Sequence, residues 1–298
     1  MSHAASPSTQ RVYGVMRVSQ EWEIPRSSFY AARQRQQQPA CSPARRGPKT
    51  RYRDQELLEH IRAVIDQGPF SGEGHRKIWA RLRFQAIRTS KGRVLRLMRL
   101  ANLLAPARRP PQVDLHDHSG SIVAERPNQI WGTDATAAFT RRDGRVTIFL
   151  AVDHCSSDCL GIHAAKKGTR FEALEPIRQG VRDYCGGFAE AVAVGIKLRH
   201  DHGSQFMADD YQQEVRFLGL ESSPAFVRQP ECNGCAERFI RTLKEQLLWV
   251  RCFDTVEELR QALLEFRQAY NQRWILQRHG YRTPNQVRQD LLALGAAA

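Results

Sequence analysis

The chain has 298 residues and a formal net charge of +14, from 45 Lys and Arg against 31 Asp and Glu. Because 41% of the residues are hydrophobic, the chain can bury sizeable cores, which excludes a wholly disordered protein. It contains no run of about 18 uncharged apolar residues, and its first thirty residues hold no apolar segment, so neither a membrane span nor a secretory signal is expected. Seven scattered cysteines, an odd number, indicate a reducing cytoplasm rather than a disulfide scaffold.

The excess positive charge is concentrated in the first part of the chain. Residues 1–120 carry 22 Lys and Arg against 9 Asp and Glu, a net of +13, whereas residues 121–298 carry 23 against 22, a net of +1. Such asymmetry is typical of a region that binds a polyanion. Nucleic acid is favoured over an acidic membrane surface, because no Lys-rich amphipathic helix with a Trp or Phe face is evident.

Residues 1–53 predict a short helical segment followed by a basic linker. A helix is expected between Arg11 and Trp22, and Ser27 or Ser28 could cap a second one. The stretch QRQQQPACSPARRGPKTRYR is rich in Gln, Pro and Arg, a composition that is typical of an extended linker.

Residues 54–105 predict three short basic helices. Leu57, Ile61 and Val64 recur on one face of the first helix, and the later segments GHRKIWARLRFQ and GRVLRLMRLANLL repeat this spacing. The pattern is compatible with a helix-turn-helix DNA-binding region, and equally with an ordinary basic helical bundle. The candidate DNA-binding cations here are Arg76, Lys77, Arg81, Arg93 and Arg96.

Residues 106–127 contain four prolines and predict a linker. After it, the spacing of the apolar residues changes from one typical of helices to one typical of strands. Strands are expected over 130–139 and 145–153, joined by a turn that contains Asp143-Gly144, and a third over 160–165. Alternating helices and strands should follow, namely helix 169–185, strand 192–199, helix 208–218, strand 218–224, helices 233–249 and 256–270, and a last helix after Pro284. Residues 128–298 therefore predict an α/β domain with a mixed sheet.

Three carboxylates in this domain are candidate catalytic residues. Asp134 lies in an apolar stretch where an unpaired acid would be expensive. Asp201 follows a strand end, where α/β sheets place their ligands. Glu237 opens a helix after Asn233-Gly234, with 35 residues between it and Asp201. Taken singly, each acid could be structural: a hydrogen-bonded strand residue, a turn former and a helix-dipole partner.

Together with their neighbours, the three acids resemble a known family. The segments IWGTDATAAF, LRHDHGSQF and PECNGCAERFIRTLKEQ resemble the three catalytic blocks of retroviral-integrase-type DDE transposases, in particular those of bacterial insertion sequences. The segment YNQRWILQRHGYRTPNQV resembles the closing block of that family, although Leu276 replaces a common histidine. The resemblance extends over roughly residues 70–287. It implies an RNase H-like core with a mixed five-stranded sheet flanked by helices, preceded by a basic all-α helix-turn-helix region.

The resemblance implies a chemistry that the residue types suit. In-line displacement at phosphorus needs metal ions and positioned charge, and two Mg²⁺ ions can activate the entering oxygen and stabilise the leaving one. Mg²⁺ prefers oxygen ligands, so Asp134, Asp201 and Glu237 are expected to hold it, with Mn²⁺ as a possible substitute. The implied activity is that of a polynucleotidyl transferase that cuts and joins DNA.

Further DNA contacts are implied beside the acids. Glu237, Arg241 and Lys244 share one helix face, and a basic residue at the position of Lys244 contacts terminal DNA in the family. The alternative to a DNA contact is a structural role, in which Glu237 and Arg241 form a solvent-exposed ion pair. Asn233, Ser204 and Gln205 also match positions that approach DNA. Zinc is not expected, because the pair Cys232–Cys235 lacks a convincing second pair of ligands.

The expected function is thus that of a DNA transposase that binds the ends of an insertion element. Double-stranded DNA is the expected partner, together with a second copy of the chain, since two ends must be held at once. An upstream-frame protein could be a further partner, because family members are often made as frameshift fusions. A cytoplasmic, nucleoid-associated location would follow. The alternatives are a catalytically silent DNA-binding regulator and an RNase H-type nuclease that acts on hybrids.

Overall fold

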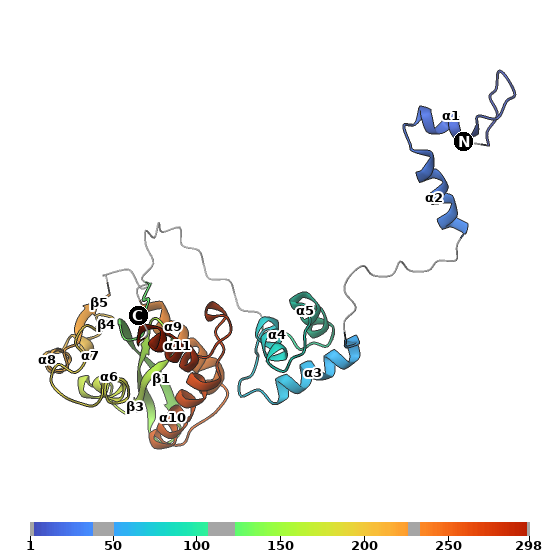
Figure 1. Cartoon of the computed structure of the whole chain (residues 1–298). Coiled ribbons are helices and arrows are strands. Elements are labelled where there is room, and N and C mark those ends of the chain that lie inside the picture. Colours follow the sequence, from blue (N-terminus) through green and yellow to red (C-terminus); the bar gives the residue numbers. More distant parts are fainter. Residues whose placement is uncertain (1–2, 38–50, 107–122, 226–232, 297–298) are drawn as a thin grey trace. The chain divides into compact units, whose positions relative to one another are not determined.

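The computed structural model describes residues 3–37, 51–106, 123–225 and 233–296 (Figure 1). The chain divides into two compact units, Met1–Arg51 and Tyr52–Ala298. Most of the two expected linkers lies outside the described residues. Within the described ranges, no helix has the length and apolar character that a membrane crossing requires.

The first unit consists of helices α1 (Gly14–Glu21) and α2 (Arg26–Gln37). Helix α1 confirms the helix predicted between Arg11 and Trp22. Neither Ser27 nor Ser28 caps α2, because that helix already begins at Arg26 and both serines lie in its first turn.

The second unit begins with three helices, α3 (Asp54–Asp66), α4 (His75–Phe84) and α5 (Lys91–Leu100), as the periodicity predicted. The side chain of Ser90 caps α5 by accepting a hydrogen bond from the backbone N–H of Arg93 at 3.2 Å. The apolar face of each helix contributes to one small core, whose buried members are Leu57, Ile61, Val64, Ile78, Leu82, Ile87, Val94, Leu97 and Met98.

A five-stranded mixed sheet forms the rest of the second unit. Its strands are β1 (Ile130–Thr140), β2 (Gly144–Asp153), β3 (Cys159–Ala165), β4 (Lys197–His200) and β5 (Glu221–Pro224). They lie in the order β3-β2-β1-β4-β5, with β1, β2 and β3 antiparallel and β4 and β5 parallel to β1. The predicted Asp143-Gly144 turn sets the register of β1 on β2, in which Thr140 faces Gly144.

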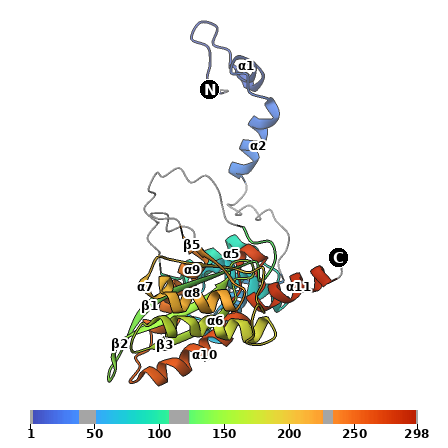
Figure 2. The same ribbon diagram turned by 90° about the vertical axis from the view of Figure 1, so that its left-hand side faces the viewer.

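Helices cover both faces of the sheet (Figures 1 and 2). Because side chains alternate along a strand, Phe149 and Ala151 of β2 face α6 (Arg170–Tyr184), α7 (Ser204–Met207) and α8 (Asp209–Phe217). Ile148, Leu150 and Val152 face α9 (Gly234–Leu243) and α10 (Val256–Arg273). The chain ends with a short 3₁₀ helix, η3 (Gln277–His279), and with α11 (Pro284–Ala296). This architecture is the RNase H-like mixed sheet that the resemblance implied.

Three predicted elements differ from those in the structure. The apolar run 192–199 forms a strand only from Lys197, because Ala191 (φ 54°) and Gly195 (φ 88°) adopt left-handed conformations that interrupt an extended chain. The strand expected over 218–224 begins only at Glu221, after Gly219 (φ 81°) in a left-handed conformation. The helix expected over 208–218 is confirmed as α8, and the separate short helix α7 precedes it. The helix expected over 233–249 changes from α9 to a π-helical turn, η2 (Lys244–Leu248).

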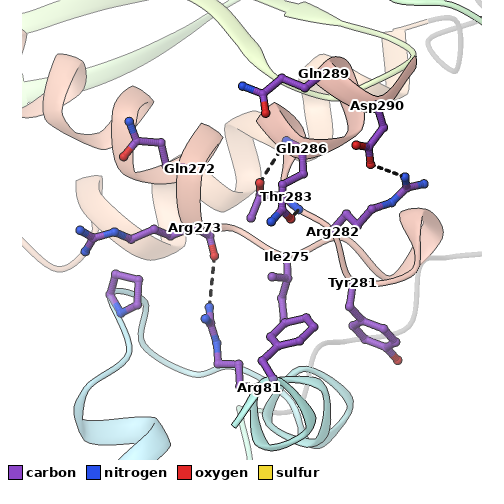
Figure 3. Close-up of a pocket in the computed structure, with 12 residues that line it drawn as sticks. Arg81, Gln272, Arg273, Ile275, Tyr281, Arg282, Thr283, Gln286, Gln289 and Asp290 are labelled. Carbon is purple, nitrogen blue, oxygen red and sulfur yellow. Dashed lines mark hydrogen bonds and ion pairs between the residues drawn. The ribbon is translucent and has the colours of Figure 1, made fainter. Parts of the chain in front are cut away.

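The three-helix region contacts the closing block of the core within the second unit. Phe70, between α3 and α4, packs edge-on against the ring of Trp274 at 4.9 Å, and the Lys77 Nζ lies 3.0 Å from the centre of that ring. Gln246 forms two hydrogen bonds with the backbone of Ser71, each 2.9 Å long. Beside these contacts, a cavity of about 500 Å³ opens between α4 and the closing block, where Arg81 donates to the Arg273 carbonyl (Figure 3).

Candidate active site

The three acids belong to elements that meet on one face of the sheet. Asp134 in β1 faces Leu150 across the ladder, and Leu150 belongs to the core that α9 covers. Arg199 in β4 faces Gly132 in β1, two residues before Asp134. Because side chains alternate along a strand, Arg199 projects from the same face as Asp134, and Asp201 follows two residues later.

Glu237 reaches this face from above the sheet. It lies in the first turn of α9, whose buried residues Ala236 and Phe239 pack on the same core as Leu150. Asp134 is half-buried at the foot of the site, whereas Asp201 and Glu237 are exposed. The order of the strands therefore brings together acids that are 67 and 36 positions apart in the chain.

The pKa of Asp134 depends on its burial and on the charges of the other two acids. Burial raises the pKa of its carboxyl to about 6, against the ordinary value of 3.8. The Ala135 N–H, which donates to Asp134 Oδ1 at 2.7 Å, lowers this pKa; the charges of Asp201 and Glu237 raise it, and Lys244 lowers it. The site thus concentrates negative charge, which the charge of Lys244 partly offsets.

The donor chemistry of this site fits a hard divalent cation. Three carboxylates offer the oxygen ligands that Mg²⁺ prefers, and a bound cation would relieve the repulsion that raises the pKa of Asp134. Nevertheless, no group of three His, Cys, Asp or Glu side chains in the described residues is gathered closely enough to hold a metal ion. Asp201 is instead engaged locally, since its Oδ1 accepts from the Gly203 N–H at 2.8 Å.

The predicted DNA contacts beside the acids lie in different environments. Arg241 is exposed on α9, and Lys244 is half-buried at the start of η2, near enough to Asp134 to lower its pKa. Ser204 is exposed and Gln205 is half-buried at the start of α7. Asn233 is buried, and its Nδ2 donates to the Thr133 carbonyl at 2.9 Å. The structure thus gives Asn233 an internal partner that the sequence did not suggest.

The predicted cations of the three-helix region also have internal partners. Arg93 and Arg96 both donate to Asp54, at 2.8 and 2.5 Å, and these hydrogen bonds lower the pKa of that carboxyl. Glu73 accepts from Arg81 and lies 3.7 Å from the Lys77 Nζ. Arg76 donates to the Gln277 side chain at 3.4 Å. The DNA contacts of all five remain predictions.

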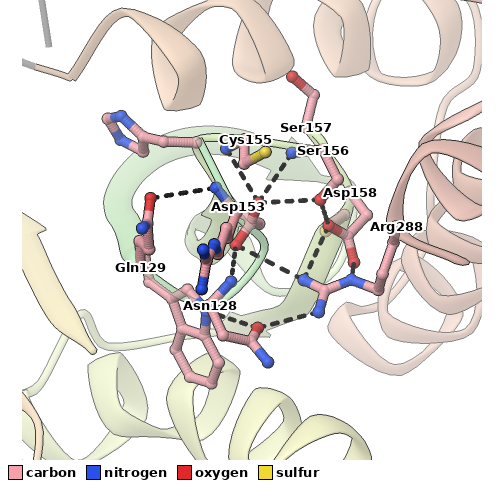
Figure 4. A network of polar contacts seen from close by, with 12 residues as sticks. Asn128, Gln129, Asp153, Cys155, Ser156, Ser157, Asp158 and Arg288 are labelled. Atoms are coloured by element: carbon pink, nitrogen blue, oxygen red, sulfur yellow. Dashed lines mark hydrogen bonds and ion pairs between the residues drawn. The ribbon is translucent and has the colours of Figure 1, made fainter. Parts of the chain in front are cut away.

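A buried polar network that the sequence did not reveal fixes one end of the sheet (Figure 4). Asp153, the last residue of β2, accepts hydrogen bonds from the backbone N–H groups of Asn128, Cys155 and Ser156 at 2.8 to 2.9 Å. Arg288 of α11 donates to Asp158 at 2.8 Å and lies 3.6 Å from Asp153. The only signal in the sequence was a pair of acids that close a strand, which is also typical of an ordinary turn.

The cysteines do not form a cluster within the described part of the chain. Cys155 and Cys159 are buried, and burial raises the pKa of the Cys155 thiol to about 11. Cys235 lies at the start of α9, but its potential partner Cys232 is outside the described residues.

Comparisons with known proteins agree with this architecture. Residues 218–284 match the family model of an integrase core domain, and residues 52–111 match that of an HTH-like domain. These matches and the relatives below support the resemblance to insertion-element transposases with an integrase-type core.

Two curated relatives come from Escherichia coli. The chain is 27% identical over 246 residues to the transposase InsD for insertion element IS2D of strain K12, which covers 80% of this chain and 81% of that protein. It is 26% identical over 289 residues to the 48.2 kDa protein of insertion element IS2A, with 95% of this chain covered. The chain spans 66% of the length of that larger relative.

Solved structures with a similar fold are retroviral. The catalytic core domain of BIV integrase is 20% identical, with 57% of this chain and 99% of that one covered, at a TM-score of 0.42. The catalytic core domain of HTLV-2 integrase in complex with magnesium is 18% identical, with 55% and 97% covered, at a TM-score of 0.41.

Proposed function

We propose that this chain binds the ends of an insertion element and catalyses metal-dependent cleavage and strand transfer of DNA. The observation that supports the proposal is that Asp134, Asp201 and Glu237 lie on one face of the sheet, where burial first, and then the charges of Asp201 and Glu237, raise the pKa of Asp134 to about 6. Partial burial of an acid is costly, and an acid with a raised pKa beside other carboxylates is a candidate for a functional site.

Each acid has a role that its environment supports. Asp134 is the most rigid, because β1 pairs with strands on both sides and the Ala135 N–H orients its carboxylate, so it suits a ligand shared between ions. Asp201 and Glu237, both exposed, suit one ion each. Two Mg²⁺ ions, or Mn²⁺ in their place, would supply the Lewis acidity for displacement at phosphorus. Lys244 would then hold a phosphate of the bound strand beside the acids.

A division of labour along the chain completes the proposal. Residues 54–105 would bind DNA, residues 106–127 would connect, and residues 128–298 would carry out the chemistry, while residues 1–53 form a separate helical segment. Arg76 is the best placed of the predicted cations in α4, because its single 3.4 Å hydrogen bond to Gln277 is easily exchanged for a phosphate. To contact a phosphate, Arg93 and Arg96 would need to give up their hydrogen bonds to Asp54 or to bind Asp54 and the phosphate at the same time.

Strand-transfer assays on element-end DNA test the catalytic part. Asp134→Asn, Asp201→Asn and Glu237→Gln should each abolish cleavage and joining while DNA binding is retained. Glu190→Gln, at an exposed loop position, is the matched control and should keep full activity. Wild-type activity in any one of the three variants would remove that residue from the site.

The same substrates separate the two alternative functions. A DNA-binding regulator would bind element ends without cutting them in Mg²⁺ or Mn²⁺, and an RNase H-type nuclease would cleave hybrids without needing ends. The transposase proposal expects end-specific cutting, by a multimer that holds two ends. Sedimentation with and without end DNA measures that multimer, and addition of an upstream-frame protein tests whether a second polypeptide is required.

Salt dependence tests the DNA-binding region separately. If the basic helices contact phosphates, log K should fall linearly with log [salt], and Arg76→Gln should reduce the slope by about 1. A slope unchanged by Arg76→Gln would place the contact elsewhere.

A further inference from the structure

Four buried polar atoms beside the candidate site lack a hydrogen-bond partner. They are Nε and Nη1 of Arg199, Nε2 of His154 and Oδ1 of Asn233. His154 and Asn233 are only 7% and 6% exposed. Leaving a buried donor or acceptor unpaired costs about 1–3 kcal/mol, so such a group of atoms needs an explanation.

The side chains of Asn233 and His154 lie against Gly132 of β1, and Arg199 stands opposite it on β4. A Cβ at this position would lie 2.5 Å from Asn233 Oδ1 and 2.6 Å from His154 Nε2. Arg199 faces Gly132 across the β1–β4 ladder, and burial first, and then the charge of Arg199, lowers the pKa of His154 to about 4. The glycine therefore provides the space that Asn233 and His154 occupy, next to the strand that carries Arg199.

Each element that carries an acid also contributes to this cluster. Arg199 lies two residues before Asp201 in the chain, and Asn233 lies four residues before Glu237 at the start of α9. The Nδ2 of Asn233 donates to the carbonyl of Thr133, the residue before Asp134. A link through the cluster would thus connect β1, β4 and α9 directly beneath the acids.

The position of His154 is set independently of the acids. Its backbone N–H donates to the Ile130 carbonyl at 2.9 Å, and its own carbonyl accepts from Arg278 at 3.0 Å. The imidazole is therefore presented to the cluster from a fixed backbone at the end of β2.

The unpartnered atoms are chemically complementary. The Arg199 nitrogens only donate, Asn233 Oδ1 only accepts, and the imidazole nitrogen of His154 does either according to its tautomer. Other buried arginines in the described part of the chain have carboxylate partners, as Arg288 has Asp158 and Arg267 has Asp183. Arg199 thus has potential partners close by, but is not bonded to them while the acids stand apart.

We propose that Arg199, His154 and Asn233 are positioning residues, whose unpartnered atoms hydrogen-bond to one another, directly or through water, as the acids are drawn together. The link sets the spacing of Asp134, Asp201 and Glu237 for a divalent cation. This inference rests on the proposed function, because it assumes that these acids bind the metal. It accounts for two observations together. The three acids do not form a group that could hold a metal ion, and the polar atoms beneath them lack hydrogen-bond partners.

Binding of Mn²⁺ to the full chain without DNA, followed by the loss of the free-ion EPR signal, tests the proposal. Arg199→Met and His154→Leu should each weaken Mn²⁺ binding by about 10-fold or more, as loss of groups that orient metal ligands commonly does. The result for Arg199→Met is diagnostic. Removing a cation from beside three acids would by charge alone strengthen Mn²⁺ binding, so tighter binding in this variant would overturn the proposal.

A double-mutant cycle provides the second readout. If Arg199 and His154 act through one link, the double variant that combines Arg199→Met with His154→Leu should bind Mn²⁺ no more weakly than whichever single variant has the lower affinity. If the fold-loss of Mn²⁺ affinity in the double variant equals the product of the two single losses, the two residues act independently, which contradicts the link. Arg199→Lys guards against a folding artefact, because it keeps the charge but lacks the guanidinium fork; it should weaken binding as Arg199→Met does, and wild-type affinity would refute the positioning role.

Two controls separate this inference from the proposed function. Asp134→Asn should abolish Mn²⁺ binding, and if it does not, the metal site itself is wrong. If Asp134→Asn abolishes binding while the variants of Arg199 and His154 bind as the wild type does, only the positioning role fails. Arg267→Met removes another buried arginine, one that bonds to Asp183 and to backbone carbonyls of β3. It should lower the melting temperature and leave the Mn²⁺ affinity of the folded protein unchanged.

Discussion

Replacing Asp134 with asparagine is expected to stabilise the metal-free protein at neutral pH. The wild-type carboxyl is half-buried, and its ionised form is disfavoured by burial first and then by the charges of Asp201 and Glu237. Asparagine has nearly the same shape, keeps an oxygen that can accept from the Ala135 N–H, and carries no charge. The substitution therefore removes the repulsion without removing the local hydrogen bond.

The magnitude follows from the pKa of Asp134. Burial and repulsion raise it from 3.8 to about 6, and each pH unit corresponds to about 1.4 kcal/mol. The penalty for ionising Asp134 in the folded state is therefore about 3 kcal/mol. Such a change is large against the total stability of a typical domain, which is about 5–15 kcal/mol.

The sign of the pH dependence follows from the same values. Below pH 3.8 the carboxyl is protonated in both states and costs nothing. Between pH 3.8 and about 6 the unfolded chain has released its proton while the folded chain keeps it, so wild-type stability is lost as the pH rises. The advantage of Asp134→Asn should thus grow across this window and reach its plateau above about pH 6.

Urea unfolding in EDTA at pH 5, 6, 7 and 8 measures this advantage, with Glu190→Gln as the exposed control. A constant difference across this range, or a variant less stable than the wild type at pH 8, would refute the reasoning. Adding Mg²⁺ at about 1,000 times its Kd should then reverse the order, because such a ligand concentration stabilises the folded state by about 4.1 kcal/mol, more than the advantage of the variant. Asp134→Asn should gain nothing from Mg²⁺.

Three further substitutions test the packing around the site by urea unfolding. Arg288→Gln leaves Asp158 buried without its cation, and the free energy of unfolding should fall by about 3–5 kcal/mol; a change below about 1 kcal/mol would contradict the paired geometry. Phe70→Ala removes a buried ring that anchors the three-helix region on the core and should cost about 3–5 kcal/mol, and hydrogen exchange should show α3 and α4 opening before the sheet. Gly132→Ala places a methyl group against two polar side chains and should cost about 1–3 kcal/mol, whereas Gly234→Ala, which meets nothing within 4 Å, is the control and should be nearly neutral.

Local patterns predicted most of the secondary structure correctly. The Asp143-Gly144 turn between two alternating runs predicted β1 and β2 and set their register, and the 3.6-residue periodicity of the basic region predicted α3, α4 and α5. These features depend on neighbours a few residues apart. The same local patterns gave a wrong strand boundary near Ala191 and Gly195. There the backbone is left-handed, and it interrupts an apolar run that periodicity alone could not distinguish from a strand.

The sequence also singled out the three acids as candidates, because each stands in a motif that carries its own local context. Their mutual geometry could not be predicted in the same way. It depends on β4 adding beside β1 with Arg199 opposite Gly132, which is a pairing between residues 67 positions apart. The spacing of the acids follows from that register and not from any motif.

The chain by itself thus determined the elements, the basic front region and the residue types suited to metal-dependent chemistry on DNA. Only the tertiary structure decided that Asn233 turns inward to Thr133 and that Arg93 and Arg96 share Asp54. It also decided that Nε and Nη1 of the half-buried Arg199 have no hydrogen-bond partner. The physical reason is that a periodicity records which face of an element is apolar, whereas the partner of a polar side chain depends on which distant element packs against it. Charged residues that look alike in the sequence therefore have different environments in the fold.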